Sequence, residues 1–318
     1  MAIRVGTANL KKRFIGASEV LLVYVGANLI YKAITKYVSD YSARVIADGG
    51  TVEGLTNVTT IAQNLRNSDL FERLTLLFIP SGVKASKAYV LLPEDGTGAL
   101  TVVRNTTGTY FNSSMILVLS AANVARYTYL TVGGNPFLLD EPQTTNVNIY
   151  SEDIGDSSYI KIGLNISGTP PYLNQIAAPD NNVTADLMIE DATTGTHRIS
   201  QNSTVVNATT HTASYFVKKL GRSKTRINLF GAFVNFDLNT ASIISSSGTI
   251  IASGIQSYAN DWFRCFITVQ STSTTATPIF YALDNAGNVT YTGTNIGSIY
   301  VWGIQLEQGT LTSYIPTV

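Results

Sequence analysis

Near the end of the chain the sequence reads Ile299-Tyr300-Val301-Trp302-Gly303-Ile304-Gln305-Leu306-Glu307. Side chains of an extended strand alternate between the two faces of a sheet. The even-numbered positions from Tyr300 to Leu306 are all apolar, whereas the odd-numbered positions become polar at Gln305 and Glu307. One apolar face and one mixed face are typical of a half-buried antiparallel strand. The pattern therefore predicts a strand that closes a β-sandwich, with the apolar even-numbered side chains on one face.

The residues before this strand contain further strand-sized pieces, separated by turn residues at the spacing of a β-sandwich. The candidates are Ser214–Leu220, Thr225–Phe230, Phe233–Leu238, Thr249–Ser253, Trp262–Gln270 and Pro278–Leu283, with the last strand over Ser298–Leu306. The piece Trp262–Gln270 is apolar on both faces, which predicts a central strand with the single cysteine, Cys265, in the core.

The N-terminal half has a different organisation. Two aliphatic-Gly-Ala units, at Gly16 and Gly26, lie ten residues apart and predict a β-hairpin or a two-stranded arm. From Thr56 to Leu77 the apolar spacing becomes three to five residues, which predicts one amphipathic helix. Strand-sized pieces follow, and the polar stretch from Glu141 to Asn146 suggests a boundary. The predicted domains are a β-arm over 1–45, a mixed β domain with one helix over 46–145, and a sandwich over 146–318. The expected fold class is mainly β.

The composition excludes several classes of function. Charged residues make up only 13% of the 318 residues, against about 25% in typical proteins. Lys+Arg and Asp+Glu both number 21, so the basic excess expected of a nucleic-acid-binding protein is missing. One cysteine and two histidines leave little material for a disulfide framework, a zinc site or His-based catalysis. No secretion signal is evident, and the apolar run over 20–30 is too short to span a bilayer. We expect a soluble protein with no membrane insertion.

Several sequence segments resemble those of a known protein family. The ending YVWGIQLEQGTLTSYIPT (Tyr300 to Thr317) is similar to the C-terminal ending of many tailed-bacteriophage virion proteins. Asn260–Cys265 resembles that family's Trp-aromatic-Arg strand, and Phe236-Asp237-Leu238 with Gly248-Thr249 resembles another of its segments. LLDEPQTTNVNIYSED, starting at Leu138, is similar to its linker, and RNTTGTYFNSS, starting at Arg104, to an upstream segment. The resemblance covers about residues 100 to 318. The polar Asn146–Ile149 departs from the apolar run usual there.

This resemblance implies a carbohydrate-binding-module-like (concanavalin-like) jelly roll carried on a tail fibre, a head fibre or a capsid decoration. The implied function is that of a structural virion component that contributes to host attachment by binding surface glycan. The implied partners are other copies of the chain, as a dimer or trimer, other virion proteins through the N-terminal region, and host glycan. The implied location is the virion, assembled in the host cytoplasm. The alternative is a purely architectural capsid or tail subunit with no glycan ligand.

Glycan binding needs aromatic faces for the sugar rings and polar groups for the hydroxyls. The candidate ligand-binding residues are Tyr215, Tyr281, Tyr291, Trp302, Asn235 and Asn285. Trp302 lies in a strand with apolar neighbours, and a core position is the competing prediction. Tyr291 lies in the loop-like segment 289–293 and is the best candidate for exposure.

Metal binding and catalysis have few candidates. Leu283–Asn288 resembles a fragment of a calcium loop, which makes Asp284 and Asn288 candidates for a structural calcium, but the same residues predict an ordinary hairpin turn. Glu190 and His197 lie close in sequence without a third or fourth metal ligand. Nucleophile-elbow and phosphate-loop motifs are absent, as is the repetitive β-helix of polysaccharide-cleaving fibres. We expect no enzymatic activity and no cofactor other than this calcium.

Overall fold

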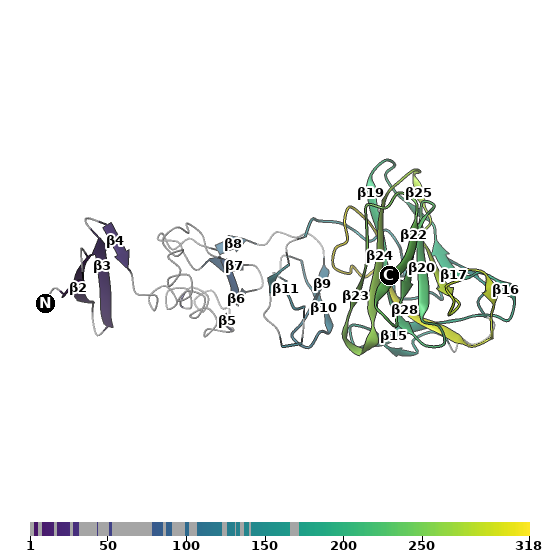
Figure 1. Ribbon diagram of the computed structural model, residues 1–318, viewed down its shortest axis with the longest axis horizontal. Helices are drawn as coiled ribbons and strands as arrows, with labels where there is room; N and C mark the ends of the chain where they lie inside the picture. Colours follow the sequence, from purple (N-terminus) through teal and green to yellow (C-terminus); the bar gives the residue numbers. More distant parts are fainter. Residues whose placement is uncertain are drawn as a thin grey trace. The chain divides into compact units, whose positions relative to one another are not determined.

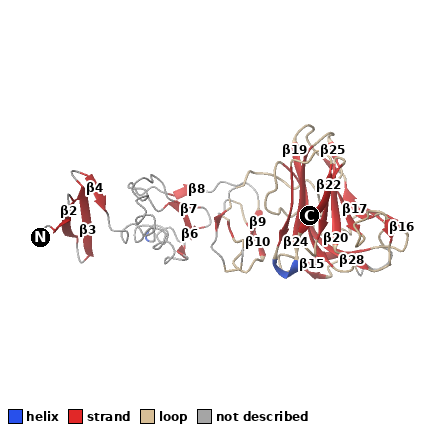
Figure 2. Ribbon diagram, in the orientation of Figure 1, coloured by secondary structure: helices blue, strands red, loops and turns tan. Residues whose placement is uncertain are grey.

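The computed structural model describes residues 3–5, 8–15, 18–25, 28–31, 43, 51–52, 78–84, 87–90, 99–101, 107–122, 126–130, 132–133, 137–139, 141–165 and 172–318. Strands dominate these residues (Figure 2), which confirms the mainly-β prediction. The segment η2 (Ala259–Asp261) is a single 3₁₀ turn. The helix predicted over 56–77 lies outside the described residues. Within the described part, no helix has the length and apolarity needed to cross a membrane.

The chain divides into two compact units, of which the first is residues 1–106, 121–127 and 136–139. Figure 1 labels most of its strands. This unit contains two four-stranded antiparallel sheets. Their strands, in spatial order, are β1 (Ile3–Val5), β2 (Ala8–Ile15), β3 (Ser18–Val25) and β4 (Asn28–Tyr31), then β5 (Thr51–Val52), β6 (Phe78–Lys84), β7 (Lys87–Val90) and β8 (Ala99–Thr101). The predicted hairpin is therefore part of a four-stranded sheet. The short strands β11 (Tyr127–Thr128) and β12 (Phe137–Leu138) pair with each other.

The second unit comprises residues 107–120, 128–135 and 140–318 and contains a sandwich of two six-stranded antiparallel sheets. Sheet I has the order β13 (Tyr159–Ile162), β17 (His197–Gln201), β26 (Ile279–Leu283), β20 (Lys224–Leu229), β21 (Ala232–Asp237) and β22 (Ser242–Ser247). Sheet II has the order β14 (Ile176–Ala177), β15 (Val183–Ile189), β28 (Gly297–Gln308), β19 (Thr210–Lys219), β24 (Phe263–Gln270) and β23 (Ala252–Ser257). Two short pairs, β16 (Thr194–Gly195) with β27 (Tyr291–Thr292) and β18 (Ser203–Thr204) with β25 (Thr275–Ala276), complete it.

The main core lies between the two sheets because each sheet turns an apolar face inward. Its buried members include Ile199, Tyr215, Ile227, Phe236 and Phe280. Cys265 is fully buried there, as predicted, and burial raises the pKa of its thiol. The predicted antiparallel sandwich is confirmed.

A second apolar cluster covers the outer face of sheet II. Its buried members are Leu117, Ala178, Ala185, Phe216, Trp262, Trp302 and Tyr314. The hairpin of β9 (Gly108–Phe111) and β10 (Leu117–Ser120) contributes to it, and Phe111 stacks on Tyr258 with ring centroids 4.4 Å apart. Thr109 Oγ1 donates to the carbonyl of Tyr314 at 2.6 Å, which ties the hairpin to the C-terminal tail.

Strand β28 differs from its predicted pattern. Trp302 belongs to the outer cluster, whereas Ile304 belongs to the main core, so these two even-numbered side chains point to opposite faces. The pairing register between β28 and β19 shifts at this point, and Gly303 has a φ of +61°. Such a bulge adds one residue to a strand and reverses the alternation beyond it. The prediction of a single apolar face was wrong, because it assumed strict alternation along the strand and this bulge interrupts it.

The polar segment Asn146–Ile149 is built into the sandwich. Asn146 is buried, its Nδ2 donates to the carbonyl of Ile304 at 2.9 Å, and its Oδ1 accepts from the amide of Leu306 at 3.0 Å. Asn148 Nδ2 donates to Gln201 at 3.0 Å. The polar side chains replace the missing apolar run by hydrogen bonds to neighbouring strands. The domain boundaries at 45 and 145 stay predictions.

Candidate functional site

Four of the six predicted glycan-binding residues are buried, and Trp302 and Tyr215 are the most completely enclosed. Trp302 is 2% exposed, and its Nε1 donates to Thr184 at 3.0 Å while its ring lies 4.6 Å from that of Tyr314. Tyr215 is fully buried in the main core, where its hydroxyl bonds to Thr225. Neither ring offers a face to a ligand in this structure. For Trp302, the competing core prediction is confirmed.

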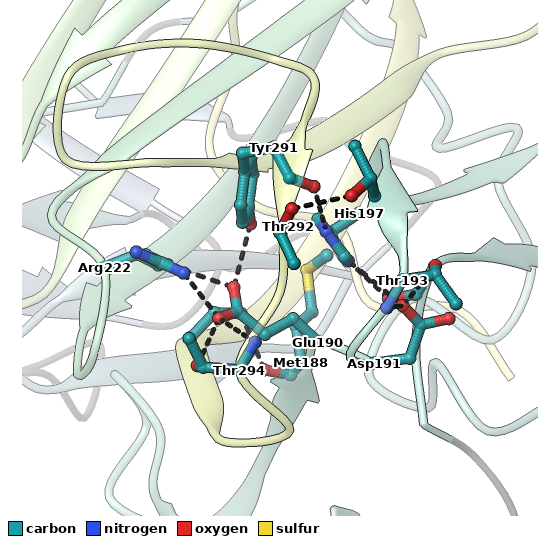
Figure 3. Close-up of polar contacts among 12 residues, drawn as sticks. Met188, Glu190, Asp191, Thr193, His197, Arg222, Tyr291, Thr292 and Thr294 are labelled. Atoms are coloured by element: carbon teal, nitrogen blue, oxygen red, sulfur yellow. Dashed lines mark hydrogen bonds and ion pairs between the residues drawn. The ribbon is translucent and has the colours of Figure 1, made fainter.

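Tyr291 is also covered, which corrects its expected exposure. It is 8% exposed, and its hydroxyl donates to Oε2 of Glu190 at 2.9 Å (Figure 3). Glu190 directly follows β15 and is fully buried. Arg222 binds both carboxylate oxygens, through Nη2 at 2.6 Å and Nε at 3.0 Å. Thr294 donates its amide and its hydroxyl to Oε1 at 3.0 and 2.6 Å.

This arrangement, which we call the Glu190 clamp, consists of Glu190, Arg222, Tyr291 and Thr294. Burial by itself raises the pKa of Glu190, but the hydrogen bonds from Arg222, Thr294 and Tyr291 outweigh it and hold the pKa below its ordinary value. The guanidinium also lies 4.8 Å from the ring centroid of Tyr291. A charged carboxylate with both oxygens occupied by donors is suited to fixing loops rather than to transferring protons. The clamp joins the end of β15 to the segments around residues 222 and 291–294.

His197 packs against the Glu190 clamp through the ring of Tyr291. Its imidazole is fully buried and lies 4.4 Å from the Tyr291 ring. Nδ1 lies 2.6 Å from the carbonyl oxygen of Gly163, and Nε2 lies 3.3 Å from that of Tyr291. Asp191 approaches Nδ1 at 3.9 Å (Figure 3). Both ring nitrogens therefore face backbone acceptors, and the histidine helps to hold Tyr291 in place.

The remaining aromatic candidate, Tyr281, lies at the centre of a different feature. Five register pairs place one residue from each strand of sheet I directly opposite the next, in a line across the sheet. We call this line the cross-sheet row; its members are Ile162, Arg198, Tyr281, Arg226, Asn235 and Ser245. Along β20 the buried residues Thr225 and Ile227 alternate with half-buried ones, so the row occupies the outer face.

From Arg198 to Ser245, each side chain of the row interacts with the next one along it. Arg198 and Arg226 have their Cζ atoms 5.8 and 5.9 Å from the ring centroid of Tyr281. The Cζ atom of Arg226 also lies 4.0 Å from the ring centroid of Phe233. Phe233 lies on the same face of β21 as Asn235. Its Nε donates to Asn235 Oδ1 at 2.6 Å. These contacts hold flat groups in fixed positions on the surface of the sheet.

The row is partly open to solvent. Arg198, Tyr281, Arg226 and Phe233 are half-buried, whereas Asn235 is 6% exposed. Asn235 Nδ2 donates to Ser245 Oγ at 3.0 Å, so its amide is held on both sides. Burial lowers the pKa of Arg226, and Tyr281 opposes that shift. Of the predicted residues, the structure brings Tyr281 and Asn235 together here.

Asn285 lies in an exposed turn that follows β26. Its Oδ1 accepts from the amide of Ser223 at 3.4 Å. Asp284 accepts from the backbone amide and from Nδ2 of Asn288 at 2.7 and 2.8 Å. These bonds confirm a turn, but it is not the predicted hairpin, because β26 pairs with β17 and β20 whereas β27 pairs with β16. Within the part of the chain that the structure describes, no group of three or more His, Cys, Asp or Glu side chains could hold a metal ion, and calcium at Asp284 and Asn288 stays a prediction.

No binding role was predicted from the sequence for Arg198, Arg226 or Phe233. Each occupies an outward position beside a core residue, and this alternation is visible in the sequence once the strand is assigned. The pairing that places Arg198 opposite Tyr281, 83 positions along the chain, is not visible there. The register of distant strands therefore determined which residues meet.

Comparison with known proteins gives limited information. No protein-family model matches the chain, and no curated protein matches it. Among solved structures, the chain is similar to the CBM22-1–GH10 modules of the Clostridium thermocellum endo-1,4-beta-D-xylanase 10B complexed with xylohexaose. The identity is 11% and the TM-score is 0.27, over 55% of this chain and 29% of the xylanase chain. Neither value is high enough to transfer a ligand or an activity to this chain.

Proposed function

We propose that this chain is a structural component of a bacteriophage virion, carried on a tail or head appendage, and that its sandwich binds glycan on the host surface. The sequence phrases between residues 100 and 318 that resemble tailed-phage virion proteins support the virion assignment. In this proposal the N-terminal region contacts other virion proteins, and the sandwich meets the host.

The cross-sheet row is the observation that supports glycan binding. Tyr281 and Phe233 have half-buried rings. Arg226 covers part of the Phe233 ring, and the two arginines flank Tyr281 at about 6 Å, so the parts of both rings that stay open can pack against the C–H surface of a sugar. Guanidinium and hydroxyl groups on either side can exchange hydrogen bonds with sugar hydroxyls. Arg226 is already oriented by Phe233 and Asn235, which reduces the entropy lost on binding. A flat face of this kind suits an extended oligosaccharide, and several copies per virion would raise a modest affinity.

The proposal is of binding without catalysis. Glu190 and Glu307 are fully buried, and their carboxylates accept hydrogen bonds from neighbouring side chains and amides. Glycosidases need a pair of carboxyl groups that flank an accessible sugar bond. These two buried carboxylates support a structural role in the sandwich.

Binding of the full chain to a glycan array and to host cells tests the proposal. Tyr281→Ala removes the central ring, and we expect it to weaken binding about tenfold or more, equivalent to roughly 1.4 kcal/mol. Tyr150→Ala is the matched control because Tyr150 is an exposed tyrosine outside the row. Circular dichroism checks that both variants are folded. Unchanged binding in Tyr281→Ala, or no binding by the folded wild type, would refute the glycan assignment.

A second candidate function is purely architectural. It is favoured by the edge of the sandwich at β22 and β23, because residues 238–260 contain no charged side chain. All six residues of β22 are exposed, including Ile243 and Ile244. Edge strands of soluble proteins usually carry charges or bulges that prevent pairing with another chain. The pairing of β22 with β21 has a bulge at Ile244, but the strand carries no charge. An uncharged, exposed edge suits a subunit that associates with its own copies as a dimer or trimer.

A further inference from the structure

The cross-sheet row contains two positive charges and no negative charge. Arg198 and Arg226 flank Tyr281, and among the described residues neither has a carboxylate within ion-pairing distance. Arg222 is different, since Glu190 binds its guanidinium at two points. The acid nearest to the row along β21 is Asp237, whose Oδ2 lies 4.0 Å from Lys224 Nζ. No carboxylate in the part of the chain that the structure describes therefore neutralises the two arginines of the row.

The geometry leaves these guanidinium groups available to a ligand. Arg226 is bound through Nε to Asn235, and its described hydrogen bonds do not include either Nη group. Its plane is fixed by the Phe233 ring, 4.0 Å away, and Tyr281 lies on its other side. An oriented guanidinium binds a carboxylate through two parallel hydrogen bonds, an arrangement that a sugar hydroxyl cannot match.

The spacing of the two arginines matches the length of a repeating unit in an extended polysaccharide. They lie on β17 and β20, which are separated only by β26. Two strand spacings place their backbones about 10 Å apart, close to the length of a disaccharide unit in an extended chain. A sugar ring stacked on Tyr281 would then have an arginine on each side.

We infer that the cross-sheet row selects an acidic glycan, a polysaccharide whose sugars carry carboxylates, such as a chain of hexuronic acid. This inference rests on the proposed function and specifies its ligand. Tyr281 stacks on one ring, and Arg198 and Arg226 each bind a carboxylate of the chain. Partial burial of both guanidinium groups strengthens these contacts relative to those of a fully solvated arginine.

Calorimetric titration of the full chain with two matched probes tests the inference. The first probe is an oligomer of galacturonic acid, and the second is its carboxyl-reduced, neutral galactose counterpart. We expect the acidic oligomer to bind at least about tenfold more tightly, and its affinity to fall with added salt. Arg198→Gln and Arg226→Gln should each remove most of this preference, so that the ratio of the two affinities falls toward one.

The controls separate this inference from the proposed function. Lys219→Gln removes a positive charge outside the row and should leave the preference intact, and circular dichroism confirms that each variant is folded. Equal affinity for both oligomers, lost in Tyr281→Ala, would overturn acid selection and preserve glycan binding. A preference for a sulfated oligomer over the galacturonic one would overturn the carboxylate assignment. Binding of neither oligomer would overturn the inference, and the glycan array would then decide on the proposed function.

Discussion

Asp186, on β15, couples the stability of the sandwich to pH. It is 1% exposed, and its two oxygens accept from the backbone amides of Ile154 at 2.9 Å and Asn174 at 2.8 Å. Burial raises its pKa to about 7, although both amide hydrogen bonds act in the opposite direction. The neighbouring carboxylates of Asp153 and Glu152 add to the increase. The folded protein therefore holds a proton on Asp186 at pH values where an exposed carboxyl has lost it.

This difference predicts the sign of a pH effect. The pKa of an unfolded aspartate is about 3.9, so folding takes up a proton between about pH 4 and pH 7. The contribution of Asp186 to stability is fully present below pH 4 and is lost as the pH rises to 7. The loss is about 4 kcal/mol at most. Asp186→Asn cannot titrate, so we expect the wild type to lose stability relative to this variant across that window.

Urea unfolding of both proteins at pH 4.5 and pH 7.5 measures this effect. The free energy of unfolding of the wild type minus that of Asp186→Asn should be larger at pH 4.5 than at pH 7.5. Asp237→Asn is a suitable control for the loss of an aspartate, because Asp237 is only half-buried. A difference between wild type and Asp186→Asn that stays constant with pH would contradict the coupling.

At the scale of strands, much of sheet I and sheet II could be predicted from the sequence. The expected strands Thr225–Phe230 and Trp262–Gln270 correspond within a residue to β20 and β24. Alternation of large apolar side chains located them, since each strand packs one or both faces against the core. The expected strand Thr249–Ser253 instead covers most of the connection between β22 and β23 and only the first two residues of β23. Those two strands are rich in serine and carry little alternation, so the Ile250-Ile251 pair was misleading.

The candidate site could be predicted only in part, because residue type alone does not show which side chains face solvent. Tyr281 and Asn235 could be proposed from the sequence because tyrosine and asparagine often bind sugars. The same argument selected Tyr291 and Trp302, which the fold encloses. Burial of Tyr291 depends on Glu190, 101 positions away, and the direction of Trp302 depends on the bulge at Gly303. Long-range register and local bulges decide which side chains face solvent, and neither follows from composition.

The edge strand β22 gives a prediction at the same scale. It has one neighbour in sheet I, and its exposed residues include Ile243 at 41% and Ile244 at 46%. If two copies pair along this edge, a lysine at 243 brings like charges together across the interface, which costs several kcal/mol. We expect Ile243→Lys to shift the full chain toward monomer in sedimentation velocity.

Val183→Lys provides the control for this experiment. Val183 is also an exposed apolar residue, but its strand β15 has neighbours on both sides. The control should sediment like the wild type. A monomeric wild type, or an Ile243→Lys variant that associates as the wild type does, would show that β22 is not an assembly edge.

At the scale of the whole molecule, the outer cluster of sheet II determines where the chain can be shortened. The β9–β10 hairpin contributes Leu117 and Phe111 to that cluster, and the amide of Leu117 donates to the carbonyl of Pro179 at 2.9 Å. The sequence reading placed the sandwich boundary at 145, which excludes this hairpin. A chain starting at residue 107 keeps it, whereas a chain starting at residue 146 leaves one side of the cluster uncovered.

Tryptophan fluorescence distinguishes the two truncations, because both tryptophans of the chain, Trp262 and Trp302, belong to this cluster. We expect residues 107–318 to retain the emission maximum of the full chain. Residues 146–318 should emit at longer wavelength and lose at least about 3 kcal/mol of unfolding free energy, the cost of deleting one large core side chain. Leu117→Ala in the longer fragment should reproduce part of that loss. Equal stability and equal emission of the two fragments would mean that the hairpin does not support the sandwich, and the boundary at 145 would stand.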